Sequence, residues 1–130
     1  MFTIEQIKAA HSKVKTGADF PKYIQEMAKL GIKSYEHYVS DGHINYLGTN
    51  NFVISADSKW AARSITDQAS SSKLKHSLEI HQQGQTDYPT FCLQAAEAGV
   101  EKWIVDMQKM TCAYYDKTGN TLLTEEIPVA

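Results

Sequence analysis

Three polar side chains around one predicted β-turn are the best candidates for acid–base or metal chemistry in this chain of 130 residues. They are Glu36, Asp41 and His43, and the turn is Asp41-Gly42. Histidine titrates near neutral pH and binds transition metals, and carboxylates can complete such a site. The chain contains no H-x-x-x-H, C-x-x-C or H-E-x-x-H pattern, however, and a metal needs three or four converging ligands. We therefore predict no metal and no cofactor, and a metal-dependent hydrolase at this hairpin is only the alternative function.

The other histidines and nucleophiles fit structural roles. His76 and His81 lie five residues apart on a predicted helix, about 140° around its axis, so they do not form a joint ligand pair. No G-x-S-x-G pattern or glycine-rich phosphate loop is present. Cys92 and Cys112 match no zinc or redox spacing and fit buried, inert thiols. The sequence thus lacks a catalytic signature and favours a protein that is not an enzyme.

Aromatic residues on predicted strands are the better candidates for ligand binding. The candidates are Tyr35, Tyr46, Trp103 and Tyr114. Buried tyrosine and tryptophan need a polar partner, and pockets tend to lie between structural units. We hypothesise a groove lined from both halves of the chain, with plain core packing as the alternative.

The two halves are indicated by an internal repeat. Residues 19–35 and 87–103 look like one segment written twice, at a constant offset of 68 residues (19 to 87). Aspartate, proline, alanine and glycine recur identically, at Asp19/Asp87, Pro21/Pro89, Ala28/Ala96 and Gly31/Gly99. Such a repeat predicts a duplicated unit and a pseudo-twofold fold.

Each half has the pattern of an α-α-β-β-β unit. In the first half, residues 3–54, Thr3 and Gln6 form a capping box, and we expect Gly17 to end the first helix. The second helix begins at the Phe20-Pro21 step and ends at Gly31. Strands are predicted at 32–40, 43–48 and 52–54. In the second half, residues 67–127, helices are predicted at 68–83 and 89–98 and strands at 100–107, 110–116 and 121–127.

The halves are joined by residues 55–66, with Trp60 and Ile65 as expected anchors. One half alone has too little apolar surface for a stable core, so we predict a single domain over 1–130. The fold class is α+β, with helices covering one face of a mostly antiparallel sheet. Whether the halves share one sheet is left open.

A two-residue loop at Asp41-Gly42 would place His37 opposite Tyr46 and Val39 opposite Ile44. Alternation then divides the hairpin into two faces. The predicted core face holds Tyr35, His37, Val39, Ile44 and Tyr46. The polar face holds Glu36, Tyr38, Ser40, His43 and Asn45, either as a solvated surface or as one wall of a site.

Composition excludes several partners. The net charge of −2 and the interspersed lysines argue against nucleic-acid binding and against a polybasic membrane attachment. No run approaches the ~18 apolar residues of a membrane span, and the first twenty residues lack the apolar core of a signal peptide. We therefore expect a cytoplasmic protein, without membrane or nucleic-acid partners.

Three stretches carry a resemblance to a known family. They are the opening MFTIEQIKAAHSKVKTGADFPKYIQEMAKLG, the hairpin Ser40-Asp41-Gly42-His43 and the closing GVEKWIVDMQKMTCAYYDKTGNTLLTEEIP. Over nearly the whole chain the sequence resembles the YbcV/YdfO-like proteins of enteric bacteria and their prophages, some of which are labelled "phage envelope protein". The resemblance implies a compact α+β domain in a prophage context and transfers no catalytic residues.

The favoured function is a non-enzymatic binding or regulatory protein that acts on an unknown protein or small molecule where the halves meet. A phage structural component is a second alternative, which would self-associate through an exposed strand edge. A homodimer is left open.

Overall fold

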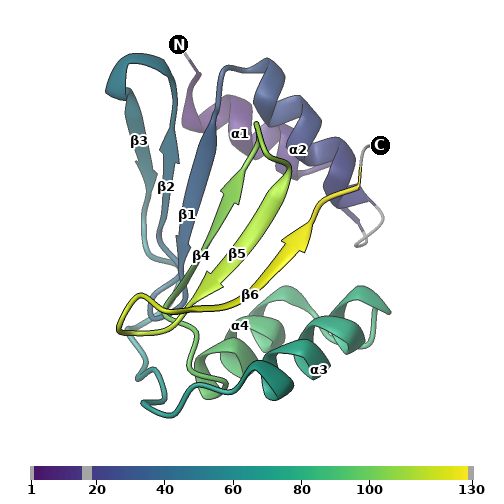
Figure 1. Ribbon diagram of the computed structural model, residues 1–130. Coiled ribbons are helices and arrows are strands. Elements are labelled where there is room, and N and C mark those ends of the chain that lie inside the picture. The colour runs from purple at the N-terminus through teal and green to yellow at the C-terminus, as the bar shows by residue number, and fades with distance from the viewer. Residues whose placement is uncertain (1, 16–18, 129–130) are drawn as a thin grey trace.

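The computed structural model describes residues 2–15 and 19–128 and contains two helical hairpins and one sheet (Figure 1). The elements of the first half are α1 (Ile4–His11), α2 (Phe20–Lys29), β1 (Ser34–Tyr38), β2 (Ile44–Leu47), the 3₁₀ turn η2 (Thr49–Asn51) and β3 (Val53–Ala56). Those of the second half are α3 (Ser71–Gln82), α4 (Tyr88–Glu97), β4 (Lys102–Asp106), β5 (Thr111–Tyr115) and β6 (Thr121–Glu126). The predicted α+β fold of two similar units is confirmed.

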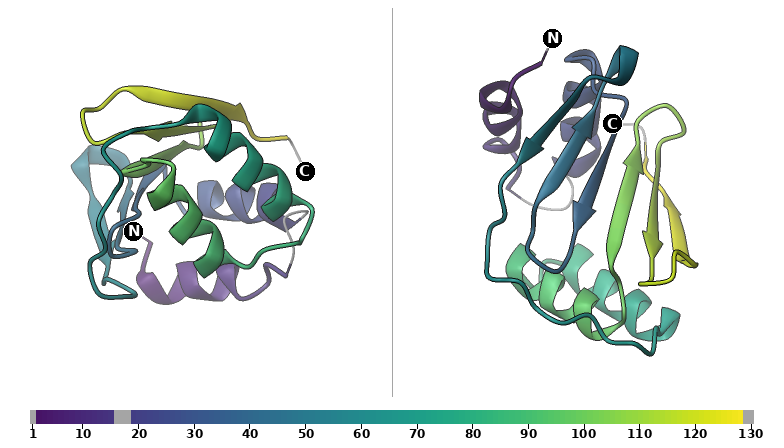
Figure 2. Two further views of the ribbon diagram at one scale, coloured as in Figure 1. Left: turned by 90° about the horizontal axis from the view of Figure 1, so that it is seen from below. Right: turned by 90° about the vertical axis from the view of Figure 1, so that its left-hand side faces the viewer.

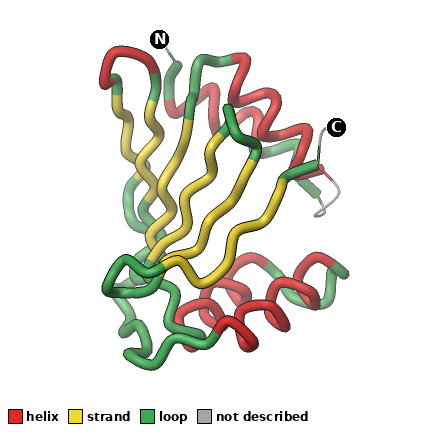
Figure 3. Tube along the Cα trace, in the orientation of Figure 1, coloured by secondary structure: helices red, strands yellow, loops and turns green. Residues whose placement is uncertain are grey.

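All six strands form one antiparallel sheet in the order β3-β2-β1-β4-β5-β6. The sheet bends around the helices, which all lie on its concave side, as the view from below in Figure 2 shows. Figure 3 marks the helices, the strands and the loops that join them. The first strands of the two halves, β1 and β4, are therefore the central pair. This pairing settles the open question of whether the halves share a sheet.

The register of the central pair has the symmetry that the repeat requires. Glu36 pairs with Ile104, its own equivalent at the offset of 68, so the pseudo-twofold axis passes between these two residues. The other pairs follow the same rule: Ser34 with Asp106, Tyr35 with Val105, His37 with Trp103 and Tyr38 with Lys102. Helices α2 and α4 also differ by 68 at both ends (20 to 88 and 29 to 97). One departure is a β-bulge, because Tyr114 pairs with Leu123 and Tyr115 with Thr121.

The helix starts follow from local hydrogen bonding. The predicted capping box is confirmed, since Gln6 N donates to Thr3 Oγ1 at 3.2 Å and Thr3 N to Gln6 Oε1 at 2.9 Å. Asp87 caps α4 by accepting a hydrogen bond from Thr90 N at 2.9 Å. Gly17, the expected end of the first helix, lies outside the described residues, and α1 has already ended at His11.

The predicted register of the first hairpin is wrong, whereas its faces are right. His37 pairs with Ile44 and Tyr35 with Tyr46, because the loop has four residues, Val39–Gly42, and not two. Gly42 N donates to Tyr38 O and Tyr38 N to His43 O, which closes the longer loop. The slip is an even number of residues, so every side chain keeps its face. All members of the predicted core face are buried.

Strand β3 extends to Ala56, two residues into the predicted linker 55–66; the rest of the linker, residues 57–66, has no helix or strand and wraps the tip of the first hairpin. Both predicted anchors pack on the core, Ile65 as a buried residue and Trp60 as a partly buried one. Backbone hydrogen bonds run from Lys59 N to Asp41 O at 2.7 Å and from Arg63 N to Ser40 O at 2.9 Å. The linker is thus held mainly by the hairpin loop.

Gly31 and Gly99 give a matched test of packing at the end of a helix. Both end a helix with positive φ, +101° and +90°, but a Cβ on Gly99 would lie 2.6 Å from Ala69 Cα, while one on Gly31 meets nothing within 4 Å. We expect Gly31→Ala to cost about 1 kcal/mol and Gly99→Ala about 2–4 kcal/mol, since only the second adds a clash with backbone to the left-handed strain. Urea denaturation measures both; equal costs would contradict the close approach of Gly99 to Ala69.

Candidate functional site at the junction of the two halves

His37 is a buried histidine in the middle of the core. It lies on β1 with 2% of its surface exposed, and its ring stacks on Trp103 with centroids 4.0 Å apart. Burial, helped by the positive charge of Lys59 and opposed in small part by its own backbone, lowers the pKa of His37 to about 3. The imidazole is therefore neutral at physiological pH. Nε2 contacts the Tyr88 hydroxyl, whereas Nδ1 has no hydrogen-bond partner in the described part of the chain.

Two residues of α4 extend the contact from His37. Tyr88 is partly buried and its hydroxyl also bonds the thiol of Cys92, which is fully buried. Burial raises the pKa of Tyr88 well above its usual value and that of Cys92 to about 12, so both stay protonated. Because the thiol and the hydroxyl can each donate once, the order Cys92 S–H to Tyr88 O to His37 Nε2 is consistent. With this order of donors, the imidazole proton lies on Nδ1, which is then a donor without an acceptor among the described residues.

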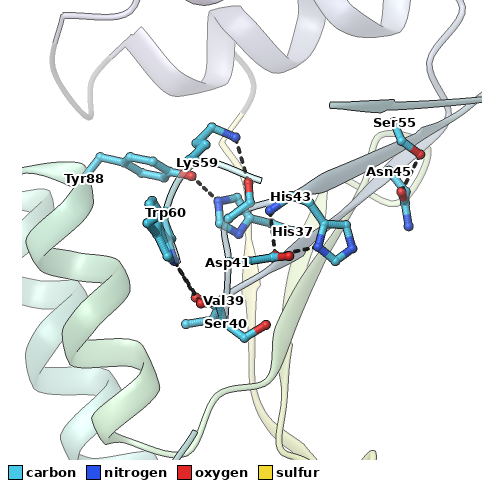
Figure 4. A network of polar contacts seen from close by, with 11 residues as sticks. His37, Val39, Ser40, Asp41, His43, Asn45, Ser55, Lys59, Trp60 and Tyr88 are labelled. Atoms are coloured by element: carbon cyan, nitrogen blue, oxygen red, sulfur yellow. Dashed lines mark hydrogen bonds and ion pairs between the residues drawn. The ribbon is translucent and has the colours of Figure 1, made fainter. Parts of the chain in front are cut away.

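Two linker residues, Trp60 and Lys59, lie beside this group. Trp60 Nε1 donates to Ser40 O at 3.1 Å, and its ring lies 6.2 Å from that of Tyr88. Lys59 Nζ donates to Gly42 O at 2.8 Å. Figure 4 shows Trp60, Lys59 and Tyr88 gathered on the same side of the hairpin tip as the His37 ring. We call His37, Tyr88, Cys92, Lys59, Trp60 and Arg63 the junction cluster, since they come from both halves and from the linker.

Arg63 adds a second cation and a second buried donor without a partner. Its guanidinium carbon lies 4.7 Å from the centre of the Trp60 ring, and Nη1 is buried without a hydrogen-bond partner in residues 2–15 and 19–128. The charges of Arg63 and Lys59 both act to lower the pKa of Cys92. Two positive charges therefore act on this buried thiol.

The repeat provides an internal comparison for the cluster. At the offset of 68, His37 corresponds to Val105, Tyr88 to Phe20 and Cys92 to Ile24. Val105 and Ile24 are fully buried, and Phe20 packs against the core. The same positions of the fold are therefore filled by apolar side chains in one copy and by hydrogen-bonding ones in the other. The fold can therefore fill these positions without hydrogen-bonding groups, as the first copy does at Phe20 and Ile24.

The predicted polar site at the hairpin is brought together only in part. His43 Nδ1 meets Asp41 Oδ1 at 2.6 Å, and the His43 ring stacks on Tyr38 at 4.3 Å. Figure 4 shows this pair on the side of the hairpin tip away from Tyr88. Glu36 instead lies on the central pair opposite Ile104. In the described residues, no group of three or more His, Cys, Asp or Glu could hold a metal ion.

The four predicted ligand-binding aromatics lie in the core. Each is 5–7% exposed, and they form two repeat-equivalent cross-strand pairs: Tyr35 with Tyr46 at 5.7 Å and Trp103 with Tyr114 at 5.8 Å. Trp103 contacts the junction cluster by stacking on His37. A ligand would reach the other three only by displacing core side chains.

Each helical hairpin has one shallow hollow between its two helices. The larger, about 510 Å³, is lined by Ser72, Lys73, His76, Ser77, Gln94 and Glu97. The smaller, about 80 Å³, lies between α1 and α2. Neither touches the junction cluster, and His76 and His81 contribute no joint ligand pair, since His81 instead faces Thr86 O at 3.0 Å.

Comparison with protein families places the chain in a known group. A family model described as "Protein of unknown function (DUF1398)" matches residues 8–126. The chain belongs to the DUF1398 family. No curated protein matches this DUF1398 chain. The YbcV/YdfO-like resemblance and its prophage context stay predictions. Among the described residues, no helix has both the length and the apolar character needed to cross a membrane.

Most of the junction cluster is not predicted from the sequence. The patterns assign His37 to the core face, Cys92 to an inert core role and Trp60 to an anchor, while Lys59, Arg63 and the hydroxyl of Tyr88 carry no recognisable signal of their own. A usable signal exists in the repeat. Comparing the copies for their differences, and not for their similarities, marks His37, Tyr88 and Cys92 as polar replacements of apolar residues.

A double-mutant cycle tests the His37–Tyr88 contact. We expect Tyr88→Phe to cost about 1–3 kcal/mol in the wild type, because it leaves a buried imidazole nitrogen without its partner. In a His37→Val background the same change should cost much less, giving a coupling free energy of about 1 kcal/mol or more. Urea denaturation of the four proteins measures it, and additive effects would show that the contact does not form.

The buried His37 also predicts a pH dependence of stability. Its pKa is about 3 in the folded state, below the 6.5 of a free histidine, so its contribution is fully present above pH 6.5 and is lost as the pH falls towards 3. Between pH 8 and pH 5 the wild type should lose about 2 kcal/mol more unfolding free energy than His37→Val. His76→Ala, which replaces an exposed histidine, is the control and should keep the wild-type profile. Parallel curves for wild type and His37→Val would contradict the burial of this ring.

Proposed function

We propose that this DUF1398 protein is a non-enzymatic binding protein that holds a small polar ligand at the junction cluster. One observation carries the proposal: polar side chains occupy buried positions where the other repeat has Val105, Phe20 and Ile24, and the Nδ1 atom of His37 has no hydrogen-bond partner in the described part of the chain. An unpartnered buried donor costs about 1–3 kcal/mol. Such a cost is commonly kept where a site needs the group for binding.

The position of the cluster supports binding. It lies where β1, α4 and the linker meet, so a ligand there would contact both halves of the molecule. The linker is irregular and rests on the hairpin loop through a few backbone hydrogen bonds. Such a segment can open locally at low free-energy cost and give a ligand access to a buried site.

Binding is favoured over hydrolysis by the chemistry of the buried groups. The Cys92 thiol is fully buried and its pKa is raised to about 12, which is the opposite of what a thiolate nucleophile needs. Asp41 and His43 are arranged like the carboxylate and the histidine of a catalytic triad. Hydrolysis would also need a nucleophile or a metal beside them. We further propose that the protein acts in the cytoplasm, in a prophage setting, and that ligand binding gives it a regulatory role.

A phage structural role is the weaker alternative. It would require self-association, and the free edges of the sheet are β3 and β6. The β6 edge carries a bulge and two glutamates, which discourage strand pairing. Size-exclusion chromatography at high protein concentration distinguishes the two roles.

Native mass spectrometry of the purified protein tests the proposed function, together with a thermal-shift panel of small acids, amides, alcohols and amines. We expect a bound mass or a saturable stabilisation in the wild type. The His37→Val/Tyr88→Phe double variant should lose it, because both hydrogen-bonding groups are gone while the residue types of the other repeat replace them.

Cys112→Ile is the matched control, since it changes a buried cysteine outside the cluster to the residue found at its repeat equivalent, Ile44. It should keep the ligand. Circular dichroism verifies that each variant is folded, and Arg63→Met provides a second variant that alters the cluster from the linker side. A bound mass or thermal shift that is the same in the wild type and in both cluster variants would contradict the proposed function.

A further inference from the structure

The polar atoms of the junction cluster are unbalanced between donors and acceptors. His37 Nδ1 is a buried donor once Nε2 accepts from Tyr88, and Arg63 Nη1 is a second buried donor; neither has a partner in residues 2–15 and 19–128. Lys59 uses one of its three donors on Gly42 O. A ligand that completes this hydrogen bonding must therefore bring acceptors.

The charges around the cluster also favour a ligand that brings acceptors. Lys59 and Arg63 are both cationic, and the guanidinium carbon of Arg63 lies 4.7 Å from the centre of the Trp60 ring, while its Nη1 has no hydrogen-bond partner among the described residues. Asp41 is the acid whose charge is felt at His37, but its Oδ1 accepts from the backbone and the ring of His43. His37 itself stays neutral, so it donates without adding charge. An anion would find two countercharges and a neutral donor.

We infer that the ligand is a small organic carboxylate, held by His37 Nδ1–H, Arg63 and Lys59 beneath Trp60. This inference rests on the proposed binding function and names its ligand class. A carboxylate matches the planar fork of arginine with two parallel hydrogen bonds, and its remaining lone pairs suit an imidazole N–H. The rings of Trp60 and Trp103 favour a carboxylate with an aromatic or apolar body.

Two pairs of probes separate charge from shape: benzoate against benzamide, and acetate against acetamide. Calorimetry and NMR titration of ¹⁵N-labelled protein are the measurements. We expect benzoate to bind saturably and to shift the His37 ring signals, and benzamide to bind at least about tenfold more weakly, the ratio expected when a charge-assisted hydrogen bond is lost. Arg63→Met should weaken benzoate about tenfold or more and leave benzamide unchanged. Lys75→Met, which removes an exposed lysine on α3, is the control and should change neither.

Three outcomes overturn this inference: benzamide binding as tightly as benzoate, unchanged benzoate binding in Arg63→Met, or no saturable binding of either carboxylate. The proposed function is tested by separate measurements. If mass spectrometry or the thermal-shift panel finds a neutral or cationic ligand that His37→Val/Tyr88→Phe loses, binding at the cluster stands and only the carboxylate class falls. If no ligand distinguishes that variant from the wild type, both fall.

Discussion

The antiparallel pairing of β1 with β4 is the contact on which the rest of the structure depends. Each half supplies only three strands and one helical hairpin, which is too little apolar surface for an independent core. Hydrogen bonding between the two first strands converts two incomplete sheets into one of six strands. It also sets the pseudo-twofold axis between Glu36 and Ile104. The register of β1 and β4 therefore determines how the equivalent residues of the two halves are related. The helices then need only cover a single concave face.

The same pairing brings together the groups of the junction cluster. His37 lies next to Glu36 at the axis, and the strand partner of His37 is Trp103, on which its ring also stacks. Helix α4 of the second half then delivers Tyr88 to a strand of the first. A cluster at such a place is sensitive to the relative position of the halves. Ligand binding there would stabilise the whole fold, since anything that binds only the folded state adds to its stability.

Local features of the sequence were sufficient to predict most of the fold. Thr3, Asp19 and Pro21 mark helix starts, Gly31 and Gly99 mark helix ends, and alternation separates the two faces of each strand. The hairpin register failed because Asp41-Gly42 closes a four-residue loop, and the face assignment survived because the error was an even number of residues.

The site was much harder to predict because its contacts are not local. His37 and Tyr88 are 51 residues apart, and Lys59, Trp60 and Arg63 lie in a segment without periodicity. No short motif encodes such a cluster. The four aromatic candidates were placed on the correct strands and the correct face, yet burial alone could not separate a binding residue from a packing one. The polar differences between the repeats single out the residues of the proposed site, and this comparison requires knowing that Tyr88 of α4 contacts His37 of β1.

The covalent connection between the halves has an evolutionary consequence. An assembly of two identical chains carries every mutation twice, so a histidine introduced into one central strand would appear in both, with two buried imidazoles near one axis. Fusion of the copies into one polypeptide removes that obligation. Position 37 can therefore carry an imidazole while position 105 carries a buried valine. A single polypeptide allows its two similar halves to differ in chemistry at one position of the fold without doubling the change.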